Sequence, residues 1–284
     1  MTLKSNYANV KRVGIIGFGH LGEFLAARLI EDPEHFEICF IWNRTLSKIS
    51  NSFQKYAIET IEEALAIKSV DLIVEVAHPD VTKMYGERFL ENSNYMIGSP
   101  TVLADDAVCR KLTEASNKHC HAVYLPSGAL WGAQDIRKMN NLGTLKKLQV
   151  TMIKHPSCFH NIDPSLRRIL DSMPTDSLKP VTLYEGPVRA LCPLAPNNVN
   201  TMAAAAVAAS SLGFDQTVGC LIADPQLTDY HKVIVSAEGP GGFKVYTERL
   251  NPAGAGAVTG QQTLYSFLAS VQAAHGHVKG IHLC

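Results

Sequence analysis

Short apolar runs alternate with longer amphipathic segments from residue 12 to residue 127. The apolar runs are predicted to be strands at 12–17, 37–42, 71–77, 95–98 and 122–125. In the segments between them, apolar residues recur at spacings of three and four, which predicts helices at 21–30, 46–56, 61–68, 81–91 and 105–118. Thr60-Ile61-Glu62-Glu63 is a capping-box pattern that would begin one of these helices. This alternation is typical of a parallel sheet flanked by helices.

The pattern changes after Pro126-Ser127-Gly128, where strands dominate. They are predicted at 147–153, 182–190, 217–222, 232–236 and 243–248, with a hairpin turn at 238–242. The Ala-rich stretch 198–213 predicts a closely packed helix that ends at a glycine. Residues 259–262 form a second capping-box pattern, and we expect the helix after it to return to the first domain.

These patterns predict an α/β protein with a Rossmann-type doubly wound parallel sheet and a second α+β domain whose sheet is mainly antiparallel. We expect residues 1–126 and 252–284 to form the dinucleotide-binding domain. Residues 127–251 would form a domain for substrate binding, catalysis and dimerisation, with a homodimer formed through the open face of its sheet.

Charge and cysteine usage exclude several functional classes. The 284 residues contain 26 Lys plus Arg and 26 Asp plus Glu, so no basic field attracts nucleic acid or an anionic membrane. The seven cysteines form no CxxC pair, which indicates reduced thiols. Residues 1–12 lack a signal-like apolar run, and the most apolar helical run, 202–212, is too short to span a bilayer. We therefore expect a cytoplasmic protein that acts on a small molecule.

A glycine-rich turn lies between the first predicted strand and the first predicted helix: Gly17-Phe18-Gly19-His20-Leu21-Gly22. The GxGxxG pattern alone is weak, but the strand before it and the helix after it are the context of a dinucleotide site. Gly17 would permit the tight turn, Gly19 would let the backbone approach a pyrophosphate, and Gly22 would let helix and strand pack closely. The pyrophosphate would then lie on the helix N-terminus.

The end of the second predicted strand bears on the choice between NAD and NADP. A site that prefers NAD usually has Asp or Glu there to bind the ribose hydroxyl. This chain has Asn43-Arg44-Thr45 instead, and Arg44 would pair with a 2′-phosphate. The sequence therefore favours NADP, or use of both coenzymes, over strict NAD. The alternative is that Arg44 is only a solvated residue at a helix start.

Two further strands end at the same carboxyl edge of the predicted sheet, where open α/β folds bind ligands. Ala77 and His78 follow one of them and Ser99 follows the other, so we expect these residues on the nicotinamide side. His78 is a candidate acid, although a histidine before a proline is more often a polar cap.

Hydride transfer needs a proton-handling group, and histidine suits that role near neutral pH. Most of the eleven histidines fall in connecting segments, in the C-terminal tail or in the glycine loop. His155, Cys158 and His160 are loosely metal-like, but no second ligand pair lies at a zinc-like spacing, so we predict no metal site. His231 follows a polar loop between two strands, a setting in which functional residues concentrate. The residues alone still leave a structural role for His231 as the more common alternative.

Four motifs together resemble the L-aspartate dehydrogenase family, especially its animal branch, over nearly the whole chain. They are the glycine loop, Leu125-Pro126-Ser127-Gly128-Ala129-Leu130-Trp131-Gly132, Pro196-Asn197-Asn198-Val199-Asn200, and Ala223-Asp224-Pro225 with His231. The resemblance implies reversible oxidation of L-aspartate by NAD or NADP, through an imine, to oxaloacetate and ammonia. It also implies that His231 is the catalytic acid/base and that Ala129 and Asn198 contact the cofactor.

A dicarboxylate substrate would need cationic or N–H anchors, and Lys154 and Arg189 are our candidates. The ordinary alternative is that both are solvated charges at strand edges. At the level of function, two other hypotheses stay open, because a fold does not fix a substrate. One is an NADP-dependent oxidoreductase for another small imine or keto acid, and the other is a non-catalytic sensor that binds NADP(H).

Overall fold

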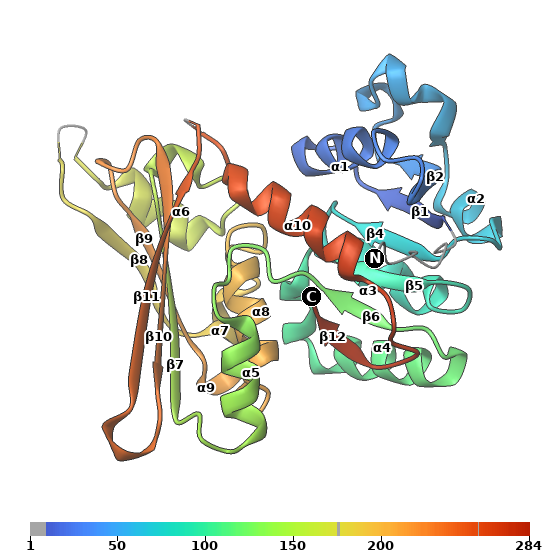
Figure 1. The fold of residues 1–284 in the computed structure, drawn as a ribbon. Helices are drawn as coiled ribbons and strands as arrows, with labels where there is room; N and C mark the ends of the chain where they lie inside the picture. Colours follow the sequence, from blue (N-terminus) through green and yellow to red (C-terminus); the bar gives the residue numbers. More distant parts are fainter. Residues whose placement is uncertain (1–9, 175–176, 255) are drawn as a thin grey trace, which may run out of the picture. The chain divides into compact units, whose positions relative to one another are not determined.

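The computed structural model describes residues 10–174, 177–254 and 256–284. Figure 1 shows a parallel sheet with its helices and, separately, a second sheet with its own helices. In chain order the elements of the first part are β1 (Lys11–Ile16), α1 (His20–Ile30), β2 (Phe36–Trp42), η1 (Leu46–Lys48), η2 (Asn51–Tyr56), β3 (Ala57–Ile58), α2 (Ile61–Ala66), β4 (Leu72–Glu75), α3 (Pro79–Phe89), β5 (Asn94–Ile97), α4 (Asp106–His119) and β6 (Val123–Leu125). A last short strand of the same sheet is β12 (Ile281–Leu283).

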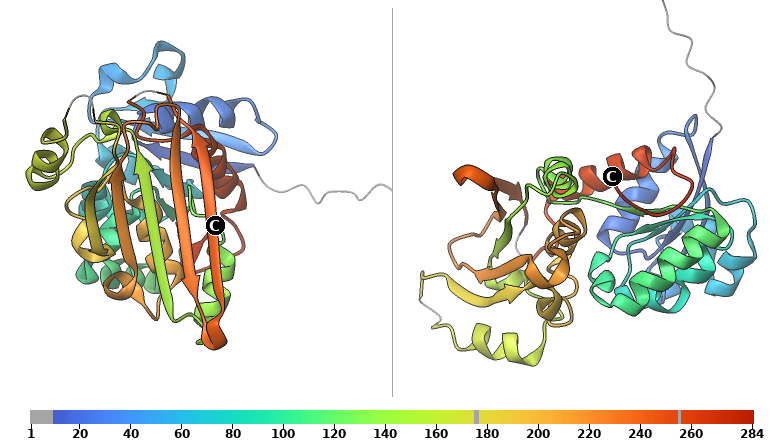
Figure 2. Two further views of the ribbon diagram at one scale, coloured as in Figure 1. Left: turned by 90° about the vertical axis from the view of Figure 1, so that its left-hand side faces the viewer. Right: turned by 90° about the horizontal axis from the view of Figure 1, so that it is seen from below.

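The seven-stranded sheet has the order β12-β6-β5-β4-β1-β2-β3, and the neighbouring strands from β6 to β3 in this order pair in parallel. The chain therefore moves outward from β1 in one direction, returns to β4 beside β1, and continues in the other direction. Right-handed connections then place α1 on one face and α3 and α4 on the other (Figure 2, right). This confirms the predicted Rossmann-type doubly wound sheet.

The local sequence explains the start of α2 and also why one predicted helix is absent. Thr60 caps α2 by accepting from the Glu63 N–H, and the Thr60 hydroxyl donates to Glu63 Oε1, so the predicted cap is present. The helix predicted at 46–56 is wrong, because the structure has the two 3₁₀ turns η1 and η2 there. Ser and Asn at positions 47 and 50–52 favour turns, since their side chains compete for backbone hydrogen bonds.

The second part of the molecule contains a smaller sheet and most of the remaining helices. Its elements are η3 (Pro100–Ala104), α5 (Ala133–Asn141), β7 (Lys147–Lys154), η4 (Pro156–Cys158), α6 (Pro164–Asp171), β8 (Val181–Pro187), α7 (Val188–Leu191), α8 (Asn200–Ala208), α9 (Gly213–Gln216), β9 (Val218–Ala223), β10 (Tyr230–Glu238), η5 (Pro240–Gly242), β11 (Lys244–Pro252) and α10 (Gln261–Ala273). The sheet order is β11-β10-β7-β9-β8, antiparallel except for the β7–β9 pair, which confirms the predicted second fold class.

Strict alternation gives this sheet one covered face and one open face. On β7 the residues Leu148, Val150 and Met152 are buried, whereas the residues between them are only half-buried. β10 alternates in the same way, with Val233, Val235 and Ala237 on the buried side. Figure 2 (left) shows the strands of the other face without helices over them. Period-two patterning therefore decides which side chains of β7 and β10 point into the core.

The Ala-rich segment packs tightly, as predicted, but it is not one helix. α8 ends at Ala208, and α9 begins at Gly213 with φ of +57°, so the chain bends between them. The alanines at 203–206 and 208 are buried, and a Cβ at Gly219 would lie 2.8 Å from Met202 Sδ. Small residues on α8 and β9 therefore let this helix lie close to the sheet.

The chain divides by internal contacts into residues 1–98, 110–124 and 274–282 in one unit and 99–109, 125–273 and 283–284 in the other. These units differ from the sequence-based domains because 99–109, α10 with the residues leading into it, and the short pieces 125–126 and 283–284 group with the second unit. α10 is tied to β11 by Asn251, whose Oδ1 accepts from the Gln262 N–H and whose Nδ2 donates to Thr263. Asn251, rather than the predicted Thr259 box, therefore caps this helix.

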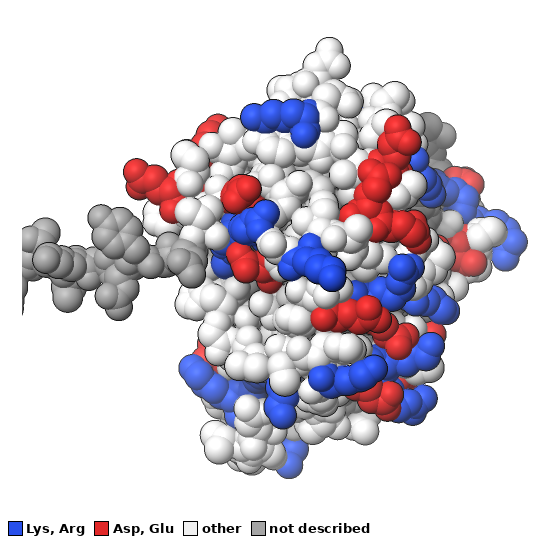
Figure 3. Space-filling model, turned by 90° about the vertical axis from the view of Figure 1, so that its right-hand side faces the viewer, with Lys and Arg blue, Asp and Glu red and all other residues white. Residues whose placement is uncertain are grey.

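Charged side chains of both signs are mixed on the face of the molecule drawn in Figure 3. Lys and Arg side chains lie beside Asp and Glu side chains on the face shown in Figure 3, in keeping with the equal numbers in the sequence. Within residues 10–174, 177–254 and 256–284, no helix has the length and apolar character needed to cross a membrane.

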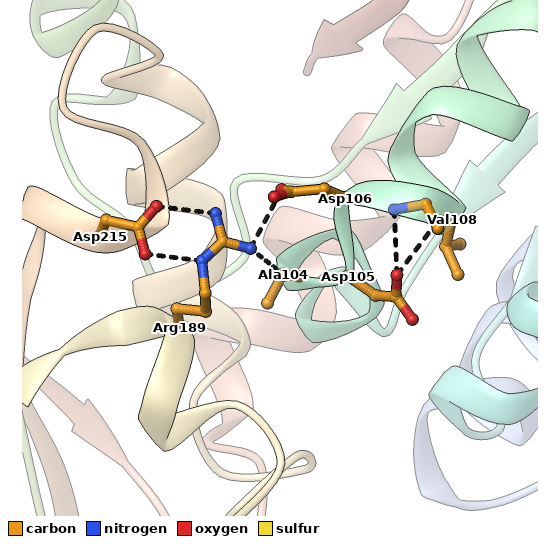
Figure 4. A network of polar contacts seen from close by, with 7 residues as sticks. Ala104, Asp105, Asp106, Val108, Arg189 and Asp215 are labelled. Atoms are coloured by element: carbon orange, nitrogen blue, oxygen red, sulfur yellow. Dashed lines mark hydrogen bonds and ion pairs between the residues drawn. The ribbon is translucent and has the colours of Figure 1, made fainter.

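Arg189 on α7 holds the segment around η3 in the second unit (Figure 4). Its Nε and Nη2 donate to the two carboxylate oxygens of Asp215 at 2.6 and 2.9 Å. Its Nη1 donates to Asp106 at 3.0 Å and to the Ala104 carbonyl. The hydrogen bond to Arg189 holds the pKa of Asp215 below its usual value. A bidentate pair with two further acceptors is a structural network.

We predict that Arg189→Met lowers the free energy of unfolding by about 1–2 kcal/mol, because three acceptors lose a charged donor in a half-exposed setting. For a protein of this size, each kcal/mol corresponds to a Tm fall of roughly 2–4 °C. Thermal unfolding followed by circular dichroism measures the change. Arg110→Met is the matched control, because Arg110 is exposed and forms no ion pair within the described part of the chain. An equal Tm for the two variants would contradict this role.

Candidate active site

The glycine loop has the backbone geometry that its sequence predicted. Gly17 has φ of +108°, and a Cβ there would lie 2.8 Å from the Val76 carbonyl. A Cβ at Gly22 would collide with the Gly17 carbonyl oxygen. A Cβ at Gly19, in contrast, would meet no atom within 4 Å. Gly17 and Gly22 are therefore required by packing inside the protein, whereas Gly19 borders open space.

That open space suits a pyrophosphate. Gly19 is the N-cap residue of α1, and no side chain caps this helix. The N–H groups of an uncapped first turn, together with the helix dipole, favour an anion. Phe18 is buried and packs edge-on against Phe53 with ring centroids 5.4 Å apart, which fixes the loop from behind. The residues of this loop therefore fit the phosphates of a dinucleotide.

Asn43 and Arg44 follow β2 and differ in their surroundings. Asn43 Oδ1 accepts from the Phe18 N–H at 3.1 Å, and Asn43 Nδ2 donates to the Thr45 carbonyl at 2.8 Å. Its amide thus orders the loop, and the Phe18 N–H is used inside the protein. Arg44 is exposed and forms no hydrogen bond or ion pair within the described residues.

The carboxyl ends of the parallel strands lie in register, since Trp42, Ile16, Glu75 and Ile97 are successive partners across β2, β1, β4 and β5. The residues predicted beyond these ends have structural partners. The Ala77 N–H donates to the buried carboxylate of Glu75, and His78 caps α3 by accepting from the Asp80 N–H.

His78 is therefore the polar cap that the sequence analysis gave as the more common alternative. Ser99 is buried at the start of η3, in the second unit.

A polar pocket lies within the second unit. It is lined by residues from β7, β10, β11, the start of α8 and the start of α10: Ala129, Met152, Lys154, Asn197, Asn198, Asn200, Thr201, His231, Val233, Asn251, Val258, Thr259, Gly260 and Thr263. Four of the residues predicted from the sequence are among them, namely Ala129, Lys154, Asn198 and His231. Strand pairing explains why these distant positions meet.

Three polar residues form a row across the covered face of the sheet. Lys232 pairs with Ile153, so Lys154 and His231 occupy the next positions on β7 and β10, and His231 pairs with Asn251 on β11. Lys154 and His231 share the parity of the buried apolar residues on β7 and β10, and Asn251, the partner of His231, is the buried residue of β11. The row Lys154–His231–Asn251 therefore takes the place of core residues at one end of the sheet.

Lys154 is a buried cation without a counter-ion. Its side chain is 2% exposed, and Nζ donates to the Val258 carbonyl at 3.0 Å and to Asn198 Oδ1 at 3.4 Å. No carboxylate forms an ion pair with it in the part of the chain that the structure describes. Burial lowers the pKa of Lys154 to about 8. An ammonium held only by neutral oxygens is a site for an anion.

His231 is 4% exposed, and its Nε2 has no hydrogen-bond partner in the structure. Burial and the neighbouring Lys154 ammonium lower its pKa to about 4, against a smaller opposite effect of a backbone hydrogen bond with Ala257. The ring is therefore neutral at pH 7, with a nitrogen available in the pocket. Such a ring has a free acceptor nitrogen but is a weak base as long as the Lys154 charge beside it is not offset.

Other side chains hold this arrangement in place. Asn198 uses its Oδ1 for Lys154 and its Nδ2 for the His160 carbonyl, so it orients the lysine. Arg249 donates to the Gly128 carbonyl at 3.2 Å and fixes the segment that brings Ala129 to the pocket. The pocket is also lined by polar residues that were not predicted from the sequence as site residues: Asn251, Asn200, Thr259 and Thr263. A buried polar residue in an alternating strand was the available signal for Asn251.

Two candidates from the sequence do not take part in this pocket. Arg189, which the sequence suggested as a substrate anchor, does not line the pocket. Its guanidinium binds Asp215 and Asp106 instead. In the metal-like segment, His155 caps η4 and the His160 ring contacts the Gly256 carbonyl. The described residues contain no group of three or more ligand side chains that would hold a metal.

Comparison with known proteins agrees with this division. The model for the NAD-binding domain of homoserine dehydrogenase matches residues 17–126, and the model for the C-terminal domain of aspartate dehydrogenase matches residues 135–270. The first match contains the glycine loop, and the second contains Lys154, His231 and Asn251. The prediction of NAD or NADP as the cofactor is therefore confirmed.

Similarity also extends over the whole chain. An aspartate dehydrogenase domain-containing protein of Danio rerio is 45% identical over 275 residues, which cover 96% of this chain and 98% of that protein. L-aspartate dehydrogenase of Nitrosopumilus maritimus is 26% identical over 84% of this chain and 87% of its own length. The crystal structure of aspartate dehydrogenase from Thermotoga maritima shares the fold, with a TM-score of 0.69, 22% identity and coverage of 94% of this chain and 97% of that one. With 45% identity over nearly its full length to such a relative, the chain belongs to the aspartate dehydrogenase family.

Proposed function

We propose that this protein catalyses the reversible NAD(P)-dependent oxidation of L-aspartate to iminosuccinate, which hydrolyses to oxaloacetate and ammonia. The observation that carries the proposal is the row Lys154–His231–Asn251, which combines an unpaired buried cation with a neutral buried base in one polar pocket. The family and the names of the archaeal relatives support the choice of substrate.

The pocket offers two anchors of the kind that a dicarboxylate requires. One carboxylate would bind the Lys154 ammonium, which has only neutral partners at present. The other would bind the first turn of α10, where Gly260, Thr259 and Thr263 line the pocket. The Thr263 hydroxyl accepts from Asn251 Nδ2, so its own proton is left to donate. A hydroxyl donor in the same pocket as a buried cation favours an anionic ligand.

His231 would act as the base. Its unpartnered Nε2 would accept a proton from the substrate ammonium, which frees the amine lone pair that expels the hydride from Cα. A bound nicotinamide ring would accept that hydride. After His231 has released that proton to solvent, water would add to the resulting iminium carbon while Nε2 takes a proton from the water and then returns it to the amine nitrogen. Collapse of the carbinolamine releases ammonia and leaves oxaloacetate.

The proposal includes a homodimer formed through the open face of the second sheet. On that face Tyr246 and Leu250 of β11 are 64% and 52% exposed, and Tyr230, 44% exposed, lies on β10 toward the Leu250 end. The charges there pair with one another, Lys232 with Glu248 and both Lys147 and Lys244 with Glu238. Exposed apolar side chains among neutralised charges favour association with a second copy.

Substrate choice is tested by following NADPH and NADH oxidation with oxaloacetate plus ammonia and with a panel of other keto acids plus ammonia. We expect the highest kcat/KM with oxaloacetate, since only a dicarboxylate uses both anchors. Higher kcat/KM with a monocarboxylic keto acid would favour the alternative imine or keto-acid reductase. Coenzyme binding without turnover of any substrate would favour the sensor.

We predict that His231→Ala lowers kcat by at least about 10²-fold, the usual scale for loss of a general acid/base, while the Kd for NADPH stays unchanged. Steady-state kinetics and fluorescence titration of NADPH measure the two quantities. Val233→Ala is the control, because Val233 lines the same face of β10 without a proton-handling group. An unchanged kcat in His231→Ala would remove this residue from the mechanism.

Binding of a dicarboxylate should depend on the charge of Lys154. Because its pKa is about 8, the lysine is protonated at lower pH and loses its charge as the pH rises above 8. We predict that succinate, which has the chain length of aspartate and no amino group, binds progressively more weakly above pH 8. Lys154→Met should bind succinate weakly at every pH, with NADPH affinity unchanged. Calorimetric titration from pH 6.5 to 9.5 measures this. The same pH dependence in both proteins would exclude Lys154 as the anchor.

The homodimer predicts a mass of two chains in sedimentation equilibrium at micromolar concentration. Leu250→Lys, which adds a charge in the centre of the exposed apolar group, should give monomers, whereas Leu142→Lys should not. Leu142 is also exposed, but it follows α5 rather than lying on the open face. Monomeric wild-type protein would contradict this part of the proposal.

A further inference from the structure

The turn after β2, in the first unit, carries two cationic side chains that play no part in the pocket described above. It contains Arg44 and Lys48, with the hydroxyl residues Thr45 and Ser47 between them. Both cations are exposed, and neither forms an ion pair or hydrogen bond within the described residues. Two cations that lack an ion pair in the described part of the structure therefore lie within five residues of each other in the chain.

The backbone folds these residues into one turn. The Lys48 N–H donates to the Thr45 carbonyl at 3.0 Å, and Asn43 Nδ2 donates to the same carbonyl at 2.8 Å. Arg44 and Lys48 therefore flank a closed turn rather than an extended loop. The side chains are free to converge on a group in front of it.

Asn43 ties this turn to the glycine loop. Its Oδ1 accepts from the Phe18 N–H while its Nδ2 holds Thr45, so one side chain sets the spacing between the pyrophosphate loop and the cationic turn. Phe53, from η2, packs on Phe18 and supports the same spacing. The turn thus has a fixed place beside the phosphate site, at the end of β2 where the adenosine ribose of a dinucleotide lies.

The position that would favour NAD carries no charge. Asn43 stands where a carboxylate would accept from both ribose hydroxyls, and its oxygen is already used by Phe18. The carboxylate that does contact this segment is Glu23, which accepts from the Ser50 hydroxyl at 3.3 Å. One carboxylate against two cations leaves the turn net positive, which suits a group of charge near −2.

We propose that Arg44 and Lys48, with the Thr45 hydroxyl, bind the 2′-phosphate of the adenosine ribose and make the protein selective for NADP(H) over NAD(H). Arg44 supplies a planar donor that can bind two phosphate oxygens, and Lys48 supplies a mobile point charge. This inference rests on binding of a dinucleotide by the first unit and not on the proposed reaction in the second, so it stands or falls without aspartate.

The test uses fragments of the coenzyme and needs no turnover. Calorimetric titration of the whole protein with adenosine 2′,5′-bisphosphate and with AMP isolates the effect of the 2′-phosphate. We expect the bisphosphate to bind at least about tenfold more tightly, the scale of one or more charge-assisted hydrogen bonds. NADPH should exceed NADH by a similar factor.

Variants then assign the effect to residues. Arg44→Ala should weaken the bisphosphate and NADPH about tenfold or more and leave AMP and NADH within about twofold. Lys48→Ala should have a smaller effect of the same kind, and Arg44→Lys should restore part of the loss. Lys68→Ala is the matched control, an exposed lysine beyond α2 without an ion pair among the described residues.

A further variant, at Asn43, distinguishes a change in coenzyme preference from a general loss of folding. Asn43→Asp keeps an acceptor for the Phe18 N–H, loses the Nδ2 hydrogen bond to the Thr45 carbonyl and adds a carboxylate beside Arg44, so the preference for the 2′-phosphate should fall or reverse while NADH still binds. Equal affinity of the wild-type protein for bisphosphate and AMP would overturn the proposal. Equal weakening of NADPH and NADH by Arg44→Ala would overturn it too.

Discussion

A lysine ammonium buried without a counter-ion is the constraint around which the second unit is arranged. Removing an ammonium from water is costly unless other groups replace its hydration, and here only Asn198 and the Val258 carbonyl do so. A neutral side chain of similar size would suit the core of this sheet better. If an anion binds there, as proposed, the ammonium gains a charged partner, and the stability lost by its burial serves binding.

The Lys154 charge also affects the protonation of His231, because it lowers the pKa of that ring. Lys154 and His231 occupy adjacent positions on paired strands, and the ammonium helps to keep the imidazole neutral. An anion bound to Lys154 would offset that effect and raise the proton affinity of His231. In the proposed reaction, substrate binding and proton acceptance would thus be coupled through one pair of side chains.

Much of the fold followed from periodicity, because buried parallel strands and amphipathic helices have distinct patterns. The failures have physical causes. Residues 46–56 carry helical spacing, but serines and asparagine there favour turns, and tertiary contacts such as Phe18–Phe53 decide the outcome. The helix 261–273 groups with the second unit because Asn251 caps it, and that contact joins residues whose sequence gives no sign of pairing.

The site was predicted unevenly for a related reason. The glycine loop is a local motif, so its sequence sufficed. Lys154 was treated as a candidate charge at a strand edge, although Leu148, Val150 and Met152 already placed position 154 on the buried face. Arg189 was chosen on charge alone, and its partners Asp106 and Asp215 lie 83 and 26 residues away along the chain. Parity within a strand identifies an unusual buried charge, whereas only the fold shows whether a charge is already paired.

The two units divide the chemistry by the kind of group that each can hold. The first uses backbone N–H groups and glycine to meet phosphates, with Asn43 fixing the distance from the loop to the turn that follows β2. The second has buried side chains whose charge states depend on one another, and in the proposed reaction these would meet carboxylates and a proton. Backbone sites tolerate change in the side chains around them, but a coupled buried row does not. Substitutions at Lys154, His231 or Asn251 should therefore alter the chemistry of the pocket together, while the dinucleotide loop depends mainly on the glycines at 17 and 22.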